Sequence, residues 1–511
     1  MKRIGIDVGG TNTDAVLLDG NDVVATIKTS TTTDVTTGVA TALNQIVEAA
    51  GAAAQDIAAV MVGTTHYTNA VIERRNLDRV AAVRISLPAS ATLTPFCDWP
   101  ADLAAVVDGG VHMIHGGHEY DGRPIVPLDE LAVADAARAM RSSGVTAVAI
   151  SAAFSPLTSA CEDRAAEIVQ NEHPDALITK SSALGRIGLL ERENVALMNA
   201  SLVRLAGSIT DAFVAAVHAS GLQAELFITQ NDGTIVRADA AKEFPVFSFA
   251  SGPTNSMRGA ALLAGRTDAM VCDVGGTTAD IGCLINGFPR QANNVVSIGG
   301  VRTLFRMPDV ASIAIGGGTI IANSNDLGPQ SVGYRLASES LVFGGDTLTL
   351  TDIAVAAELI ELGDPALVRH LDPARVRSLL AEAHAAIAEA VDRSKTDAAE
   401  LPLLAVGGGA MLVPDSIEGI DDVLHVEHQG VANAVGAAIA QVSGECDQIY
   451  RDIPRDQALR AATEAATTRA AQSGAEPSSI EVVETEDLPI SYLPGNSLRV
   501  RVRVVGDLPI S

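Results

Sequence analysis

The sequence is poor in aromatic and basic residues, and both shortages bear on its partners. Aromatic side chains make up 3% of the 511 residues, with a single tryptophan. Lys and Arg number 35 against 62 Asp and Glu, so the formal net charge is −27 at pH 7. A field of that sign repels phosphodiester backbones, and few aromatic rings are present to stack on bases. We therefore expect no nucleic-acid partner.

Cysteines and long apolar runs are also scarce. The five cysteines are widely spaced and form no CxxC pair, so the sequence predicts no zinc knuckle or iron–sulfur cradle. Unclustered thiols fit a reducing compartment. The N-terminal segment reaches Asp7 too early for a signal peptide, and no apolar run approaches the roughly 20 residues of a membrane helix. A cytoplasmic protein with no membrane association is expected.

Short β-like runs alternate with alanine-rich helical runs to about residue 445. This alternation predicts an α/β fold. Strands are expected at residues 2–8, 14–18 and 23–28, with a hairpin turn at Asp19-Gly20-Asn21-Asp22 between the last two. A long helical segment is expected at 186–220.

An internal repeat is the most informative feature of the chain. The segment Asp7-Val8-Gly9-Gly10-Thr11-Asn12-Thr13-Asp14 recurs as Asp273-Val274-Gly275-Gly276-Thr277-Thr278-Ala279-Asp280, with six of eight positions identical. Each copy follows one apolar run and precedes another. The repeat predicts a duplicated strand–turn–strand unit, and hence two related lobes with a cleft between them.

The expected division of the chain follows from this repeat. We place an N-terminal lobe at residues 1–185, a second lobe at 186–445, and a C-terminal helix with a small β element at 446–511. In the last segment, residues 498–504 alternate strictly between apolar and arginine residues. Such a strand has one buried face and one cationic face.

The two Gly-Gly-Thr turns carry the predicted chemistry. Glycine lets main-chain N–H groups approach phosphate oxygens, and the following hydroxyls add hydrogen bonds. The predicted nucleotide-binding residues are Gly9, Gly10, Thr11, Asn12, Thr13, Gly275, Gly276, Thr277 and Thr278. One such turn is commonly a simple hairpin, but two copies with matching aspartates favour a phosphate site.

Four aspartates accompany these turns. Asp7 and Asp273 end their strands, where an ionised carboxylate can hold Mg²⁺ directly or through water. They are the predicted metal ligands. Asp14 and Asp280 occupy equivalent positions after the turns, where catalysis and turn stabilisation are equally good interpretations. All four are candidate catalytic residues, and the sequence does not rank them as proton acceptors.

The turns resemble the phosphate-1 and phosphate-2 motifs of the actin/Hsp70/sugar-kinase superfold. Residues 405–410, Ala-Val-Gly-Gly-Gly-Ala, resemble its adenosine motif, and residues 433–438 resemble its second connecting helix. The resemblance implies two actin-like ATPase lobes that hold ATP and Mg²⁺, with Gly407, Gly408 and Gly409 near the adenosine. No GxxxxGK[ST] or GxGxxG motif occurs, so P-loop and Rossmann sites are disfavoured. Positive charge at the phosphates is then expected from Mg²⁺ and main-chain dipoles.

Further segments resemble the A-type subunit of the hydantoinase/oxoprolinase family. They lie at residues 63–70, 116–123, 191–200, 251–253 and 315–318. The resemblance implies an ATP-dependent hydrolase component. It would activate a lactam or cyclic amide, of hydantoin or 5-oxoproline type, by phosphorylating the carbonyl oxygen, and a B-type partner subunit would complete hydrolysis. The stretch after the adenosine motif is shorter than in large A-type subunits, which leaves the partner and the substrate open.

These segments also supply the predicted substrate-binding residues. They are Thr64, Thr65, Asn69, His118, Arg192, Gly316, Gly317 and Gly318. Each has an ordinary structural alternative: a helix N-cap for the threonines, a surface salt bridge for the arginine and a chain turn for the glycines. His112, His115 and His118 suggest a zinc site, but on a strand they would not share a face, and Gly116-Gly117 disfavours a helix.

Two other functions share the predicted ATP site. A small-molecule kinase would release a stable phosphoester, and a nucleotide-switched interaction ATPase would turn over slowly and bind a partner in one nucleotide state. A homo-oligomer is expected in each case.

Overall fold

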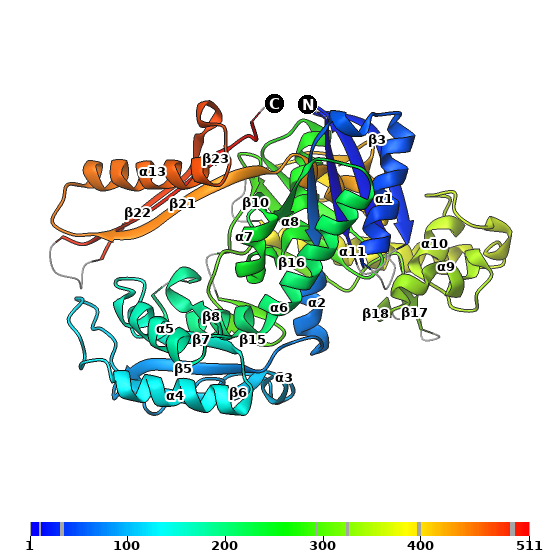
Figure 1. Ribbon diagram of the computed structural model, residues 1–511. Helices are drawn as coiled ribbons and strands as arrows, with labels where there is room; N and C mark the ends of the chain where they lie inside the picture. The colour runs from blue at the N-terminus through cyan, green and yellow to red at the C-terminus, as the bar shows by residue number, and fades with distance from the viewer. Residues whose placement is uncertain are drawn as a thin grey trace.

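The computed structural model describes residues 2–9, 12–30, 35–185, 187–292, 295–322, 327–395, 400–490 and 496–509. Three main sheets, of nine, six and four strands, carry helices on their faces (Figure 1). Two further pairs of short strands are β14 (Val296–Ile298) with β15 (Val301–Thr303) and β17 (Thr319–Ile321) with β18 (Leu327–Ser331). The arrangement confirms the predicted α/β class.

The nine-stranded sheet forms the first lobe and has the order β22-β23-β21-β10-β9-β4-β1-β2-β3. Its strands are β1 (Lys2–Val8), β2 (Asn12–Asp19), β3 (Asp22–Ser30), β4 (Ile57–Thr64), β9 (Glu225–Thr229), β10 (Thr234–Arg237), β21 (Gln441–Tyr450), β22 (Glu481–Pro489) and β23 (Leu498–Gly506). Ile4 and Ile6 pack beneath α1 (Val35–Ala50), while Val16 and Leu18 pack beneath α12 (Ala432–Ala438). Helices therefore cover both faces at β1 and β2, which explains why these strands are apolar throughout.

The six-stranded sheet repeats this plan in the second lobe. Its strands are β11 (Ala269–Val274), β12 (Ala279–Ile285), β13 (Phe288–Pro289), β16 (Val310–Ile313), β19 (Leu403–Val406) and β20 (Val423–His425). β11 pairs antiparallel with β12 and parallel with β19, as β1 pairs antiparallel with β2 and parallel with β4. α10 (Leu350–Ala356) and α11 (Pro373–Ser394) cover one face. The duplication predicted from the repeat is thus present in the strand pairing.

Two helices join the lobes through very close contacts. α12 packs on the first sheet, and α8 (Ser251–Ala264) packs on the second. A Cβ atom added at Gly436 would lie 1.8 Å from the Asn255 carbonyl oxygen, and one at Gly259 would lie 1.9 Å from that of Ala432. Only glycine, whose side chain is a hydrogen atom, allows the two helices to lie this close together. The two glycines therefore determine how closely the lobes approach each other.

The four-stranded sheet is a separate parallel unit with the order β6-β5-β7-β8. Its strands are β5 (Val80–Leu87), β6 (Asp108–His115), β7 (Ala147–Ala152) and β8 (Leu177–Lys180). α4 (Glu130–Ser143) and α5 (Ala160–Glu172) cover one face. The other face packs on α6 (Leu189–Ala219). Shorter helices lie at α2 (His66–Glu73), α3 (Ala101–Val107), α7 (Ala238–Glu243) and α9 (Leu336–Glu339).

α6 is the one helix of the described chain that is long and apolar enough to cross a membrane, and half of its most apolar window is buried inside the protein. Its Val195, Leu197 and Phe213 are fully buried in the core of the first lobe. A helix packed in this way is an ordinary core helix.

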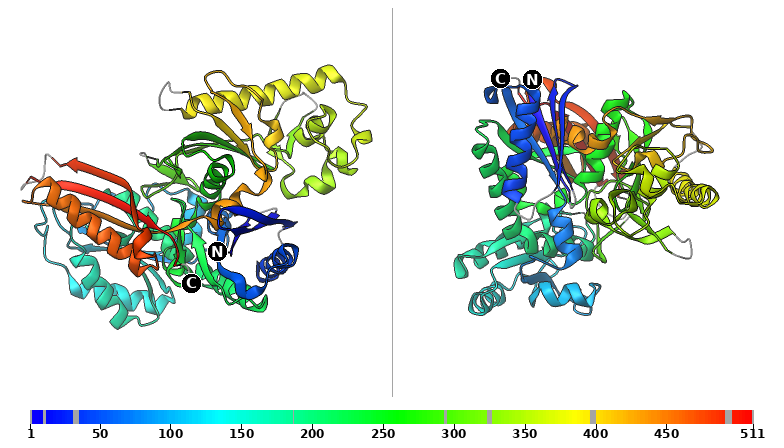
Figure 2. Two further views of the ribbon diagram at one scale, coloured as in Figure 1. Left: turned by 90° about the horizontal axis from the view of Figure 1, so that it is seen from above. Right: turned by 90° about the vertical axis from the view of Figure 1, so that its right-hand side faces the viewer.

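The C-terminal strands extend the first sheet rather than standing apart as a small element. β21 pairs parallel with β10 and antiparallel with β23, and α13 (Arg455–Gln472) lies along them (Figures 1 and 2). β9 and β10, placed by sequence in the second lobe, also belong to this sheet. The expected boundaries at residues 185 and 445 therefore do not coincide with the sheets, because the chain returns twice to the first one.

We expect Gly436→Ala to lower the free energy of unfolding by about 2 to 4 kcal/mol, because the methyl group must force α8 and α12 apart. Equilibrium urea unfolding measures this. Gly207→Ala in α6 is the matched control, since a Cβ there meets nothing within 4 Å and its effect should be neutral or slightly stabilising. Equal stability of the two variants would contradict the close-contact account.

Candidate active site

Three charged side chains lie in a row across the first lobe. Asp7 on β1 is directly opposite Asp14 on β2, and Asp14 is directly opposite Lys28 on β3. The Lys28 ammonium lies 2.6 Å from Oδ1 of Asp14 and 2.8 Å from Oδ2. Lys28 was not among the predicted site residues, and it places a cation beside the first turn.

The second lobe contains the same row with a different third member. Asp273 on β11 is opposite Asp280 on β12, and Asp280 is opposite Ser312 on β16. The Ser312 hydroxyl donates a hydrogen bond to Oδ1 of Asp280. The aspartates are therefore duplicated, whereas the cation occurs in the first row only.

Both Gly-Gly-Thr turns are closed by the same main-chain hydrogen bond. Gly9 N–H donates to the Asn12 carbonyl over 3.0 Å, and Gly275 N–H donates to the Thr278 carbonyl over 2.9 Å. Gly276 and Thr277 are exposed at the tip of the second turn, open to a ligand, and Thr13 is buried on β2. Gly10 and Thr11, also predicted to bind nucleotide, lie outside the described residues.

Asp7 and Asp273 lie one residue before the ends of β1 and β11. Asp7 is buried, Asp273 is half-buried, and the charge of Asp273 acts on Asp7. Burial raises the pKa of Asp7 to about 7, although Asn433 donates a hydrogen bond to its Oδ2 over 3.2 Å. The charges of Asp14 and Asp273 raise the pKa of Asp7 further, and that of Lys28 lowers it. Burial likewise raises the pKa of Asp273 to about 6, against the effect of the Ser256 hydroxyl.

These carboxylates fit a hard divalent cation. Oδ1 of Asp7 is buried and has no hydrogen-bond partner among the described residues, and a buried acceptor is costly when it stays unpaired. A cation between Asp7 and Asp273 would pair this oxygen and return both groups to the ionised form. The described residues contain no group of three or more metal-ligating side chains. Mg²⁺ commonly takes one or two carboxylates and completes its coordination with water and phosphate.

The predicted adenosine turn packs against the end of β11. Gly407 has a φ of +90°, and a Cβ atom there would lie 2.2 Å from Oδ1 of Asp273. Gly409 N–H donates to the Val274 carbonyl over 2.7 Å. Around Gly408 an added Cβ meets nothing within 4 Å. Residues 407–409 thus lie beside the second turn, as the parallel pairing of β19 with β11 requires.

The Gly316–Gly318 segment braces the second turn. Gly317 N–H donates to the Gly275 carbonyl over 3.0 Å, and Gly318 N–H donates to the Gly276 carbonyl over 2.7 Å. A Cβ atom at Gly316 would lie 2.7 Å from the Thr277 nitrogen. The segment was predicted to contact substrate, but these contacts give it a supporting position under the turn.

Thr64, Thr65 and Asn69 adjoin the first turn. β4 places Gly63 opposite Asp7 and Thr64 opposite Val8. The Thr64 hydroxyl is hydrogen-bonded to Nδ1 of His66, and Asn69 donates to the Thr65 hydroxyl over 3.3 Å. Thr65 precedes α2 without a side-chain capping bond, so the N-cap alternative does not explain it. Burial lowers the pKa of His66.

Two of the predicted substrate-binding residues lie away from the Gly-Gly-Thr turns. His118 is in the four-stranded unit, with Nδ1 3.9 Å from Sγ of Cys161. Arg192 is fully buried. Its guanidinium donates to the Ser181 hydroxyl over 2.9 Å and to the Ala152 carbonyl over 2.6 Å, among other bonds. These hydrogen bonds tie Arg192 to internal loops, so its guanidinium is not available to bind an anion. The prediction that Arg192 binds substrate is therefore corrected.

Two family models match the chain. Residues 3–173 match the hydantoinase/oxoprolinase N-terminal region, and residues 192–367 match the hydantoinase/oxoprolinase model. The chain is 28% identical over 391 residues to the caprolactamase subunit alpha of Pseudomonas jessenii, covering 72% of this chain and 55% of that protein. It is 26% identical over 251 residues to the acetophenone carboxylase gamma subunit of Aromatoleum aromaticum, covering 46% and 34%. The chain thus spans about half the length of the first relative and about a third of the second.

Solved structures share the whole architecture. The ATP-dependent caprolactamase from Pseudomonas jessenii superposes with a TM-score of 0.77 at 20% identity, over 99% of this chain and 88% of that chain. A nucleotide-free acetone carboxylase gives 0.73 at 16% identity, over 100% and 88%. At these identities the likeness concerns the fold. The two family models together cover more than half of the sequence, and the chain belongs to the hydantoinase/oxoprolinase family.

Proposed function

We propose that this protein is an ATP-dependent enzyme that activates a lactam or cyclic amide, of hydantoin or 5-oxoproline type, by phosphorylating its carbonyl oxygen. The observation that carries the proposal is the pair of aspartate rows on duplicated Gly-Gly-Thr turns, with the buried Asp7 within electrostatic reach of the half-buried Asp273. A relative named as a caprolactamase and a structural neighbour named as ATP-dependent support the substrate class and the nucleotide.

Each element of the site has a part in this proposal. The two turns would bind the phosphates through main-chain N–H groups, and residues 407–409 would lie near the adenosine. Asp7 and Asp273 would hold Mg²⁺, which neutralises charge on the phosphates when it is bound. Thr64, Thr65 and Asn69 adjoin the first turn and would line the substrate side.

Lys28 supplies a fixed positive charge that the motif analysis did not expect. Its ion pair holds the Asp14 carboxylate, which would keep this group ionised and oriented toward the phosphates. Among the described residues the Asp280 carboxylate has a hydroxyl partner, Ser312, and no paired cation, so we infer that the two rows have different roles. The first lobe would orient the reacting group, and the second would hold the nucleotide.

The proposed reaction conserves atoms and charge in two stages. The amide oxygen forms a bond to the γ-phosphorus while the bond from that phosphorus to the bridging oxygen of ADP breaks. Water then adds to the activated carbon and the C–N bond of the ring breaks, with the protons of that water passing to the nitrogen, which leaves an amine and an acyl phosphate. A second water displaces phosphate from the acyl phosphate and leaves a carboxylate. The residues of this chain bind, orient and exclude water during the first stage. The second stage is assigned to a partner.

The partner and the setting are also proposals. Both curated relatives are named as subunits, alpha in one case and gamma in the other. A B-type or other partner subunit would therefore complete hydrolysis. We also propose that the protein assembles as a homo-oligomer and is located in the cytoplasm. A second candidate substrate is a ketone, which the relative named as an acetophenone carboxylase subunit and the acetone carboxylase fold favour.

Phosphate release from Mg·ATP tests the proposal. The assay compares caprolactam, hydantoin, 5-oxoproline and acetophenone, with product detection in each case. One cyclic amide should stimulate release, and Lys28→Met should reduce the stimulated rate about tenfold because Asp14 loses its partner. Lys2→Met, which removes an exposed pair with Asp56, is the matched control. Stimulation by the ketone alone would select the second candidate, and none by any compound would contradict both.

The raised pKa of Asp7 gives a second prediction. A carboxyl whose folded pKa is about 7 stabilises the metal-free fold fully below its unfolded pKa, and this contribution is lost as pH rises toward 7. Relative to Asp7→Asn, the metal-free protein should therefore lose on the order of 2 to 4 kcal/mol between about pH 4 and pH 7.5. Mg²⁺ should restore most of the loss above pH 7.

Thermal unfolding of both proteins, with and without Mg²⁺, measures this difference across the pH range. The Asn variant is the control because it keeps the shape of the side chain without its titration. Parallel pH profiles for the two proteins, or no effect of Mg²⁺ on the difference between them, would contradict the assignment of Asp7 to a cation.

A further inference from the structure

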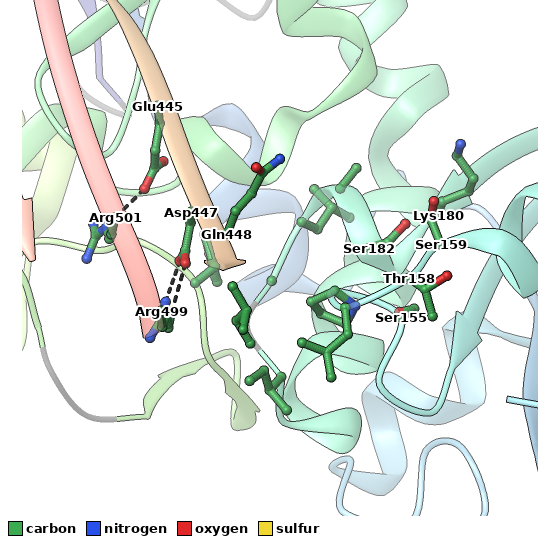
Figure 3. A pocket seen from close by; sticks show the side chains of 18 of the residues that line it. Ser155, Thr158, Ser159, Lys180, Ser182, Glu445, Asp447, Gln448, Arg499 and Arg501 are labelled. Carbon is green, nitrogen blue, oxygen red and sulfur yellow. Dashed lines mark hydrogen bonds and ion pairs between the residues drawn. The ribbon is translucent and has the colours of Figure 1, made fainter. Parts of the chain in front are cut away.

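The arginines of β23 that border the hollow between the four-stranded unit and the C-terminal strands are paired within the protein. Arg499 makes two hydrogen bonds to Asp447, and Nε of Arg501 donates to Glu445 over 2.9 Å (Figure 3). These pairs account for the cationic face that the sequence of β23 predicts. Buried polar atoms that lack a partner gather instead at the junction of the two lobes, beside Asp7.

Asn255 of α8 is fully buried and lies beside Asp7. β4 places Gly63 directly opposite Asp7. A Cβ atom at Gly63 would lie 2.7 Å from Nδ2 of Asn255 and 3.1 Å from Oδ1 of Asp7. A side chain at this position would therefore fill the space that the amide and the carboxylate share, and glycine keeps that space open.

The amide and the carboxylate beside Gly63 have complementary hydrogen-bonding capacity left over. Nδ2 of Asn255 donates to the Thr229 hydroxyl over 3.0 Å, but an amide nitrogen carries two N–H groups. Oδ1 of Asp7 has no hydrogen-bond partner within the described ranges, and neither has Oδ1 of Asn255. An unpaired buried acceptor is costly. The second N–H of Asn255 and Oδ1 of Asp7 are thus a donor and an acceptor that border the same space.

A second amide holds the other oxygen of Asp7. Asn433 on α12 donates from Nδ2 to Oδ2 of Asp7 over 3.2 Å. Asn433 lies three residues before Gly436, so the two share one face of α12, and a Cβ atom at Gly436 would lie 1.8 Å from the Asn255 carbonyl oxygen. The close contact of α8 with α12 therefore brings both amides to the same carboxylate.

The next residue of α8 lies close to the aspartate of the second lobe. Ser256 is fully buried. Burial raises the pKa of Asp273, and the Ser256 hydroxyl acts against that rise. Consecutive residues of one helix thus adjoin Asp7 in the first lobe and Asp273 in the second, so α8 forms a wall of the proposed cation site as well as joining the lobes.

Building on the function proposed above, we infer that Asn255 and Asn433 are positioning residues whose amide groups hold the two oxygens of the Asp7 carboxylate in place for the cation. Hydrogen bonds from neighbouring groups fix the orientation of a ligating carboxylate, and the loss of such a partner commonly reduces metal affinity about 10- to 100-fold. Because the amides come from α8 and α12, the same bonds link the orientation of the carboxylate to the separation of the lobes.

Binding of Mn²⁺ to the full chain at saturating ADP, with no lactam or ketone present, tests this role. Mn²⁺ accepts the same oxygen ligands as Mg²⁺, and electron paramagnetic resonance measures the unbound ion. Asn255→Ala and Asn433→Ala should each raise the Mn²⁺ dissociation constant about tenfold or more. Asn255→Leu removes the amide without leaving a large cavity and should have the same effect, so the test does not depend on one variant folding.

Thr254→Val is the matched control for packing. Thr254 is fully buried one residue earlier on α8, and its hydroxyl donates to the Asn231 carbonyl over 2.7 Å. This change should lower stability, measured by thermal unfolding, but leave the Mn²⁺ dissociation constant within about twofold of the original. An equal loss of Mn²⁺ affinity in Thr254→Val would show a general packing effect and overturn the role.

Asp7→Asn separates failure of this role from failure of the proposed function. If Asp7→Asn weakens Mn²⁺ binding but the Asn255 and Asn433 variants bind the ion normally, the role is wrong and the proposed cation site stands. If Asp7→Asn also binds Mn²⁺ normally, both are wrong. If the Mn²⁺ results are as expected but no cyclic amide or ketone stimulates ATP turnover, the role stands and the proposed function is wrong.

Discussion

The two aspartates one residue before the ends of β1 and β11 impose the main constraint on this molecule. Asp7 is buried and Asp273 is half-buried, and desolvation is the largest cause that raises their pKa values, to about 7 and about 6. Lys28 is paired with Asp14 and opposes this shift only in part. Buried carboxylates without a full counter-charge are unfavourable in a fold. Their presence in both halves of a duplicated site is explained if a cation and its phosphate ligand complete the structure.

The rest of the architecture holds these carboxylates together. α8 and α12 meet at glycines, so the two sheets approach closely enough for charges in one lobe to act on the other. Gly407 leaves room for the Asp273 carboxylate, and Gly316–Gly318 fastens the second turn from below. The glycine-rich segments, which are scattered along the sequence, thus serve one purpose at the junction of the lobes.

Much of this arrangement could be predicted because it depends on local repeats. The matching octapeptides predicted two strand–turn–strand units, and the pairing of Asp7 with Asp14 and of Asp273 with Asp280 confirms them. Lys28 escaped prediction for a specific reason. The hairpin turn pairs Asp19 with Asp22, so an unbroken ladder would place Ile27 opposite Asp14, but a bulge at Leu17 and Leu18 shifts the register by one residue.

Other features depend on long-range packing that local patterns do not report. Arg192 was a candidate anion clamp because a guanidinium can bind an anion through two hydrogen bonds, but it is fully buried and donates to the Ser181 hydroxyl and the Ala152 carbonyl. The C-terminal strands were expected to stand apart. They join the first sheet because β21 pairs with the edge of β10, which lies about 200 residues earlier in the chain. The alternation within β23 was predicted correctly; the residues that its arginines would meet were not.

The central claim is that Asp7 and Asp273 hold one cation together with a bound nucleotide. A double-mutant cycle on Mg·ATP affinity, measured by calorimetry with Asp7→Asn, Asp273→Asn and the double variant, tests it most directly. If the two carboxylates share a ligand, each single change should weaken binding strongly. The double change should add little, with a coupling energy of about 1 to 3 kcal/mol. Strictly additive losses, or affinity unchanged in either single variant, would contradict the account.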